Sequence, residues 1–530
     1  MGKRDLLFIG LLVGGAGALA YGLMPPRQTR PGTSHDASAY ADPGFTSALA
    51  RLDASFARRW TTAAPPAPDL QAARRLSLAL VGTIPSLEEI RQLETLPDAE
   101  RLPWWIDRLL KDPRSHEYLA ERFARAFVGT EDGPFLLFRR RRLSFWLGEQ
   151  LARNRSYDEM ARELIASRGL WTNEPATNFV SVTARPAMQN QPDPVRLAGR
   201  TARAFLGIRL DCVECHDKPD HLPGRPWLKR DFHRLAAFFG QTRLGFVGIH
   251  DSEKHEYDFA LKRGNEPAAI APEAPCSPEL LPAAGSRRQR LAAWITDAGN
   301  PYFARAAVNR LWAMMLGKPL VAPVDNLEAV PESEQHPALS MLADDFRANG
   351  HDLRRLIRLI ASSRAFRIDS VGDADDWSVF PLTRLRPEQV AGSVIQASSV
   401  ATIDQDSHVL VRLIRYANLN DFLQRYGDTG EEEFEERGGT IPQRLLLMNG
   451  QLVKERVRKD LFSAVSRIEA TLKDDARAVE TAYLTVLTRR PDEEERAAFV
   501  AHLQGPGDRA DKMVDLFWAL INTTEFSWNH

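Results

Sequence analysis

Apolar side chains recur at helical spacing along almost the whole chain from residue 43 onward. Leu87, Ile90 and Leu93, for example, follow at three-residue steps behind a capping box formed by Ser86 and Glu89. The same period runs through 119–128, 143–151, 160–165, 195–206, 227–239, 302–316, 337–349, 353–363 and 476–487. The alternation of β-branched residues that is typical of strands is scarce, with residues 244–260 as the exception. We therefore expect a mainly α fold.

Two stretches interrupt this helical pattern and divide the chain. Residues 25–42 are polar and rich in Pro, Gly and Ser, which is typical of a linker. Residues 246–286 contain several Pro and few periodic apolar positions, so we expect an irregular interdomain connection there that can be partly β. The sequence thus predicts two helical domains, one over 43–245 and a C-terminal module over 287–530.

The N-terminus has the pattern of a targeting segment over residues 1–24. Lys3-Arg4 gives it a positive start, and residues 6–24 are almost free of polar side chains. The Ala-Leu-Ala sequence at 18–20 fits a cleavage site, but the apolar stretch is also about as long as a minimal membrane span. We expect either a cleaved signal peptide or a membrane anchor. In both cases the protein is exported, to the periplasm or to the periplasmic face of the cytoplasmic membrane.

Composition narrows the possible partners. The chain of 530 residues is 44% hydrophobic and 26% charged, with a formal net charge of -1. These values are ordinary for a globular protein, and they give no support to a nucleic-acid partner.

Two of the three cysteines lie in one short motif, Cys212-Val-Glu-Cys215-His216. This is C-x-x-C-H, the attachment signature of c-type haem. The two thiols can add to the two vinyl groups of one haem, and the adjacent imidazole can then bind the iron as the proximal ligand. Covalent haem is attached outside the cytoplasmic membrane in bacteria, so the motif agrees with the expected export. The third cysteine, Cys276, has no His near it in sequence and is interpreted as incidental.

Two other interpretations of the motif remain open. Cys212 and Cys215 could join His221 and His233 in a small Cys₂His₂ zinc or iron site. They could also form a redox-active or structural thiol pair beside an incidental His216.

The residues around the motif indicate a loop followed by an aromatic helix. Pro219, Pro223 and Pro226 follow His216 closely, and a helix cannot run through them. Four aromatic residues come next and are either core residues or a cover that excludes water from a macrocycle. They are Trp227, Phe232, Phe238 and Phe239.

The sixth iron ligand has three leading candidates in the sequence, with His250 and His255 as further ones. Small electron-transfer cytochromes often use a downstream Met, but this chain has no Met between Met188 and Met314. Met188, His233 and His221 are the leading candidates, and the iron could also be five-coordinate. We expect His/His or five-coordinate iron rather than His/Met iron.

The sequence resembles the planctomycete-type cytochrome C domain proteins, in which a companion module of unknown function follows the cytochrome-like module. The N-terminal half carries the resemblance at 74–86, 108–114, 205–216 and 231–239. The C-terminal half carries it at 300–312, 317–326, 336–337, 352–363, 446–450 and 519–526. The resemblance implies an N-terminal cytochrome-like module and a C-terminal module without an assigned role. This chain departs from the family pattern at Lys218, where relatives usually have a His before Pro.

Three functions are compatible with these observations. The leading hypothesis is an exported c-type haem protein that transfers electrons to or from a redox partner protein. The second is an enzyme whose site lies in the C-terminal module. Its candidate polar residues are Asn309, Arg310, Asp325, Asn326, His336, Asn449 and Glu525, which could equally be structural. The third is a non-catalytic scaffold protein in which the cysteines hold zinc.

Overall fold

The computed structural model describes residues 36–530 apart from several internal segments. The segments outside the description are 131–138, 185–188, 218–225, 261–265, 373–375, 405–433, 435–439, 451–452, 454–458 and 460–462. The expected targeting segment, 1–24, lies outside the described residues, as do the ligand candidates Met188 and His221. Within the described part, no helix combines the length and the apolar character that crossing a membrane requires.

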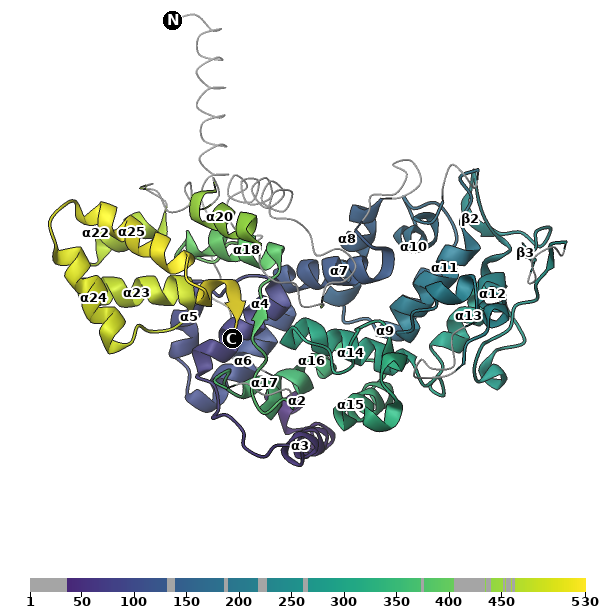
Figure 1. Cartoon of the computed structure of the whole chain (residues 1–530), viewed down its shortest axis with the longest axis horizontal. Helices are drawn as coiled ribbons and strands as arrows, with labels where there is room; N and C mark the ends of the chain where they lie inside the picture. The colour runs from purple at the N-terminus through teal and green to yellow at the C-terminus, as the bar shows by residue number, and fades with distance from the viewer. Residues whose placement is uncertain are drawn as a thin grey trace, which may run out of the picture.

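Helices make up most of the molecule, as the periodicity predicts (Figure 1). The N-terminal half contains α2 (Ala37–Ala41), α3 (Pro43–Ala57), α4 (Asp69–Val81), α5 (Leu87–Glu94), α6 (Asp98–Lys111), α7 (Pro113–Val128), α8 (Arg140–Ala152), α9 (Tyr157–Ala166), α10 (Asn178–Ser181), α11 (Pro194–Thr201) and α12 (Lys229–Ala236). The C-terminal half contains α13 (Arg287–Ile295), α14 (Phe303–Leu316), α15 (Pro337–Ala348), α16 (Leu353–Ser362), α17 (Arg364–Arg367), α18 (Pro387–Ala397), α20 (Ile441–Asn449), α22 (Ala464–Thr471), α23 (Asp475–Leu487), α24 (Glu493–Gln504) and α25 (Arg509–Ile521).

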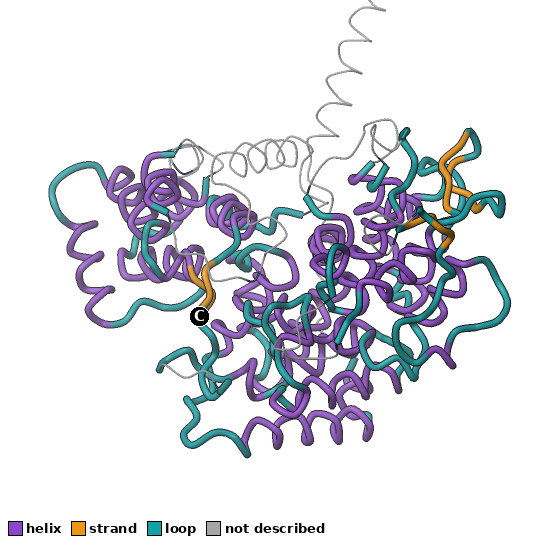
Figure 2. The backbone as a smooth tube through the Cα atoms, turned by 45° about the vertical axis from the view of Figure 1, so that its right-hand side comes forward, coloured by secondary structure: helices purple, strands orange, loops and turns teal. Residues whose placement is uncertain are grey.

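The described strands are short and antiparallel. They pair as β1 (Thr242–Gly245) with β2 (Gly248–Asp251), β3 (Asp258–Phe259) with β4 (Ala268–Ala269), and β5 (Thr383–Arg384) with β6 (Trp528–Asn529). Figure 2 shows them in orange at the edge of the helical mass and beside the C-terminus. The first two pairs lie in and next to the stretch 244–260, so the expectation of a mainly α fold with short strands in the middle is confirmed.

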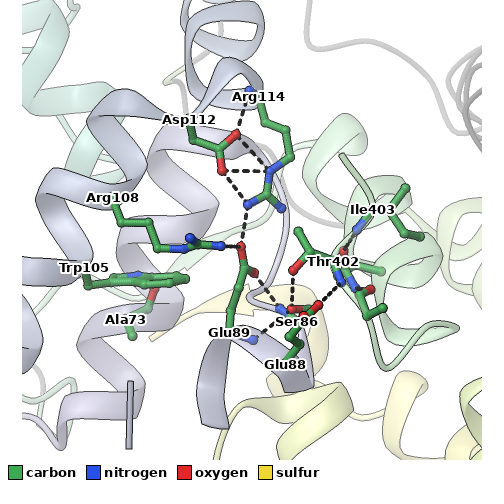
Figure 3. Close-up of polar contacts among 12 residues, drawn as sticks. Ala73, Ser86, Glu88, Glu89, Trp105, Arg108, Asp112, Arg114, Thr402 and Ile403 are labelled. Carbon is green, nitrogen blue, oxygen red and sulfur yellow. Dashed lines mark hydrogen bonds and ion pairs between the residues drawn. The ribbon is translucent and has the colours of Figure 1, made fainter. Parts of the chain in front are cut away.

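Local signals explain where the helices begin. The capping box of α5 is present: Ser86 Oγ accepts from the Glu89 N–H (3.1 Å), and Glu89 Oε2 accepts from the Ser86 N–H (2.9 Å) (Figure 3).

The last part of the predicted linker differs from expectation, because it forms the helix α2. Asp36 caps this helix, and its own backbone N–H donates to Asp107 on α6 (2.7 Å). That partner lies 71 residues away, so the composition of the linker could not reveal it.

Two hydrophobic cores organise the packing. The first core runs from Phe45 to Phe380 and thus includes helices from both sides of the connection at 246–286. In it Phe56 of α3 stacks on Trp312 of α14, with ring centroids 5.5 Å apart. The second core contains residues from Leu385 to Phe526 together with Leu78 and Ile84 of the N-terminal half. In Figure 1 the helices of this second core, α22 to α25, form a bundle at the left end of the molecule.

Candidate functional site

The C-x-x-C-H motif lies on a single tight turn. Residues 211–214 form the 3₁₀ turn η4 (Asp211–Glu214), which follows the π-helical turn η3 (Ala202–Leu206). Val213 is the buried anchor of the turn, with 2% of its surface exposed, and its N–H donates to the Leu210 carbonyl (3.0 Å). Cys212 and Cys215 are exposed free thiols. The turn therefore buries its apolar residue and presents both thiols outward.

His216 is also exposed, and its ring is oriented by the backbone. Its Nδ1 lies 2.9 Å from the Asp217 carbonyl oxygen. A carbonyl can only accept, so Nδ1 donates this hydrogen bond, and in a neutral imidazole the lone pair then lies on Nε2. This is the arrangement that metal-binding imidazoles commonly use, with one nitrogen held by a carbonyl and the other available to the metal. The donor set of two exposed thiols and one available Nε2 fits covalent haem.

His233 of α12 supports the turn from the inside. The ring is fully buried and stacks on Phe259, with centroids 3.5 Å apart. Burial lowers the pKa of His233, so the ring is neutral at pH 7. Its Nε2–H donates to the Glu214 carbonyl (3.1 Å), and its Nδ1 accepts from the Tyr257 hydroxyl (2.7 Å). Both ring nitrogens are thus engaged, and coordination of iron by His233 would require one of these hydrogen bonds to break.

The aromatic residues after the motif belong to the core. Trp227, Phe232, Phe238 and Phe239 are each at most 1% exposed. They pack among the helices rather than on the exposed face that carries the thiols, so their role here is to hold α12 and the turn η5 (Ala237–Phe239) in place.

The C-terminal module holds both ends of the motif segment. Before the motif, the Gly207 carbonyl accepts from the Leu327 N–H (2.7 Å), and Arg209 pairs with Asp325 (2.6 Å). After the motif, Trp227 Nε1 donates to Glu328 Oε2 (2.7 Å). We call these contacts of residues 325–328 the clamp. They join residues more than 100 positions apart, and the only sequence signal for them is the complementary charge of Arg209 and Asp325.

Position 207, at which the clamp contacts the segment before the motif, requires a glycine. Its φ of 62° lies in the left-handed region, and it ends the turn η3. A Cβ built there would lie 3.0 Å from the Ala306 Cβ and 3.2 Å from Leu327 Cγ. Both the backbone conformation and the space therefore favour glycine.

The polar candidates in the C-terminal module have mainly structural contacts. Asn309 Nδ2 donates to the Val321 and Val324 carbonyls (2.8 and 3.2 Å), and Asn309 Oδ1 accepts from the Val321 N–H (2.9 Å). His336 caps α15. The half-buried Asn326 donates its backbone N–H to Pro323 (3.0 Å). These contacts fix loops and helix ends.

The structure does not gather all these candidates into one site. Arg310 and Asp325 line one cavity, whereas Glu525 lines a different one beside its partner Arg489. Asn449 ends α20, and its side chain lies outside the description.

No group of three or more His, Cys, Asp or Glu that could hold a metal ion occurs among the residues that the structure places. His233, one member of the proposed Cys₂His₂ set, has both nitrogens engaged. His221, the other member, lies outside the described residues.

Comparison with known families assigns both halves of the chain. Residues 50–244 match the model of a protein of unknown function (DUF1549), and residues 287–503 match a second protein of unknown function (DUF1553). These two are the paired domains of the planctomycete type, and the chain carries both members of that pair. The matched models do not include a cytochrome c domain. No curated protein and no solved structure matches the chain.

Proposed function

We propose that this chain is an exported protein that carries covalent haem at Cys212 and Cys215 and exchanges electrons with a redox partner protein. The observation that carries the proposal is the geometry of the motif. Both thiols are free and exposed on one turn, and the adjacent His216 has its Nδ1 held by a carbonyl and its Nε2 available. Haem, when bound, supplies a one-electron couple at its iron.

The residues of the chain have distinct tasks in this proposal. The thiols of Cys212 and Cys215 would hold the haem through thioether links, and His216 Nε2 would bind its iron. His233 is a positioning residue, because it holds the Glu214 carbonyl within the motif (3.1 Å). The clamp fixes the segments on both sides, which limits the movement of the turn.

The same contacts bear on which other residue, if any, would bind the iron. Both ring nitrogens of His233 already make hydrogen bonds. Ligation of the iron by His221 or Met188, or an open coordination position, would not require either of these bonds to break. We keep His/His or five-coordinate iron as the proposal. The ferric spectrum should then lack the weak Met–iron band near roughly 695 nm. A band there that disappears in Met188→Ala would instead identify Met188 as the ligand.

Covalent attachment is tested with the full chain produced alongside the haem-maturation machinery. The wild type should show a Soret band that survives acid-acetone extraction, and Cys212→Ala with Cys215→Ala should lose it. Cys276→Ala is the matched control, because it removes the remaining cysteine and should keep the band. Wild-type protein without covalent haem, but with one zinc per chain by elemental analysis, would refute the proposal in favour of a zinc protein.

Export is tested by deleting residues 1–24. Because haem attachment takes place beyond the cytoplasmic membrane, the shortened chain should accumulate in the cytoplasm without covalent haem. Fractionation of the full-length chain distinguishes a cleaved signal peptide from an anchor. Covalent haem on the shortened cytoplasmic chain would contradict this part of the proposal.

A further inference from the structure

The hairpin formed by β1 and β2 presents bulky apolar side chains to solvent. Phe246 and Val247 form its tip between the paired residues Gly245 and Gly248, with exposed fractions of 105% and 70%. Leu170, which is 43% exposed, lies beside the hairpin, because its backbone N would be only 2.4 Å from a Cβ at position 248. We call Phe246, Val247 and Leu170 the apolar tip.

The packing of the fold does not explain the apolar tip. Side chains this exposed add little to a hydrophobic core, and turn positions favour Gly, Asn, Asp and Ser over Phe and Val. The backbone of the turn reaches a positive φ at Gly248 (88°) and not at Phe246 or Val247. Large apolar side chains that gather at one exposed place are typical of a binding surface.

The hairpin is held firmly below its tip. Ile249, which is 1% exposed, exchanges two backbone hydrogen bonds with Gly169 (2.8 and 2.9 Å). On the other strand, the Gln191 side chain donates to the Leu244 carbonyl (3.1 Å) and accepts from the Leu244 N–H (2.9 Å). The tip is therefore presented in one orientation, and binding through it does not have to order a loop first.

Aromatic and basic side chains border the apolar tip. Trp171 directly follows Leu170, is half-buried, and has the Arg139 guanidinium 5.1 Å from its ring centroid. Arg139 precedes α8, whose first turn holds the exposed Arg141 and Arg142. Figure 1 shows α8 and β2 in the same upper right part of the molecule.

The exposed charges next to the tip are mainly positive. Arg168, two residues before Leu170, is exposed and pairs with Asp251 on β2 (2.8 Å). Glu174 is an exposed carboxylate on the same segment, and its Cγ would be 3.0 Å from a Cβ at position 169. Among these described residues the exposed arginines outnumber the exposed carboxylates, which favours an anionic surface as the partner.

We propose that the apolar tip inserts into the surface of a lipid bilayer that contains anionic lipids. A stable protein interface takes about 800 Å² and roughly 20–30 residues from each partner, which is far more than three side chains on a narrow hairpin offer. A bilayer needs no matching pocket, because its acyl region takes up apolar side chains, its headgroup region accommodates Trp, and its phosphates accept from arginines. This contact goes beyond the proposed function and is independent of the haem.

The test is hydrogen exchange, followed by mass spectrometry, on the full chain with and without vesicles. The readout is local, so binding through the N-terminal segment does not decide it. Vesicles of equal parts phosphatidylcholine and phosphatidylglycerol should slow the exchange of amides 243–248 and 169–171 at least about threefold. Vesicles of phosphatidylcholine alone should slow it less. Amides of α24, at the left end of Figure 1, should exchange at an unchanged rate.

Two double variants and one control locate the surface. Phe246→Ser with Val247→Ser changes only exposed side chains, so the chain should fold and lose the slowing of amides 169–171. Arg141→Gln with Arg142→Gln should keep part of the slowing and lose the preference for the mixed vesicles. Val371→Ser replaces another apolar side chain, 73% exposed in the loop after α17, and should behave like the wild type.

Three results would overturn the proposal. The first is wild-type exchange that the mixed vesicles do not change, and the second is equal slowing in the wild type and in the variant with two serines. The third is slowing at the tip without vesicles that increases with protein concentration, because the tip would then bind a second copy of the chain. Equal slowing by both kinds of vesicle would overturn the requirement for anionic lipids.

Discussion

His336 shows how one buried histidine can make the stability of this fold depend on pH. Its Nδ1 accepts from the Ala338 N–H (3.1 Å) and so caps α15, while its ring stacks on Phe56 with centroids 4.3 Å apart. Burial, aided by the charge of Arg59, lowers the pKa of His336 to about 4. The folded state therefore holds a neutral ring whose Nδ1 must stay unprotonated to cap the helix.

The sign of the pH effect follows from this shift. The pKa of a His in the unfolded chain is about 6.5. At pH values between this pKa and the lower pKa of the folded state, His336 binds a proton in the unfolded chain but not in the folded chain. The free energy of unfolding should fall as the pH falls through this window, by up to about 3 kcal/mol from His336. His336→Asn keeps a cap acceptor without titrating there, so urea unfolding at pH 7 and pH 4 should show a smaller loss in this variant.

An exposed histidine provides the control for that measurement. His502 on α24 is exposed, so His502→Asn should lose as much stability between the two pH values as the wild type. An equal loss in His336→Asn and the wild type would show that His336 is not the source of the pH dependence.

At the residue scale, the sequence indicated the residues of the candidate site but not the residues that support it. The motif identified Cys212, Cys215 and His216 from spacing alone, because the chemistry needs these residue types next to one another. The support of the turn by His233 and Tyr257 could not be predicted. These residues lie 19 and 24 positions from their hydrogen-bond partners, and no local pattern encodes such pairs.

At the element scale, the first turn of α5 contains a residue, Glu89, that also anchors an ion network (Figure 3). Glu89 is 1% exposed and contacts Arg114 (2.5 Å) and Arg108 (3.3 Å) in addition to its capping role. Burial alone would raise the pKa of the Glu89 carboxyl, but the two arginine charges outweigh it, and the pKa is lowered. Ser86 extends the network to the C-terminal half through Thr402 (2.8 Å).

Removal of the Glu89 side chain should therefore destabilise the folded state. Glu89→Ala removes one of the two carboxylates that pair with the buried Arg114, the other being Asp112 (2.7 Å), and one half of the capping box, so we expect a loss of about 3 kcal/mol in the free energy of unfolding. Glu100→Ala, an exposed carboxylate in the first turn of α6, is the matched control and should cost less than about 1 kcal/mol. Denaturant titration measures both. A loss below about 1 kcal/mol for Glu89→Ala would show that the arginines find other acceptors.

The helices that the sequence predicted well are those with local signals. Residues 227–239 were expected to be helical and contain α12 and η5, and residues 195–206 cover α11 except for its first residue, Pro194. The latter stretch continues into the π-helical turn η3, which was not expected. This turn ends at Gly207, which lies against Ala306 of α14 and Leu327, and the helical period alone does not reveal such packing between distant segments.

At the scale of the whole molecule, the connection at 246–286 does not separate two hydrophobic cores. The first core extends to Phe380 and contains Phe303, Trp312 and Phe346 from beyond the connection. Tyr157 of α9 stacks on Phe303, with centroids 5.3 Å apart. Composition marks where the chain changes character, but it cannot show which helices later pack together, because that depends on contacts between distant segments.

The shared core leads to a prediction about fragments of the chain. A fragment of residues 36–245 lacks the helices that cover Phe56 and Tyr157, so it should expose apolar surface, lack near-ultraviolet circular dichroism and unfold without cooperativity. A fragment of residues 36–380 contains the first core and should unfold cooperatively, although it leaves Leu78 and Ile84 without the second core. Circular dichroism with urea titration compares the two. A cooperative transition in the shorter fragment would mean that the N-terminal helices form a core of their own, and that the packing of α14 adds to a domain that is already folded.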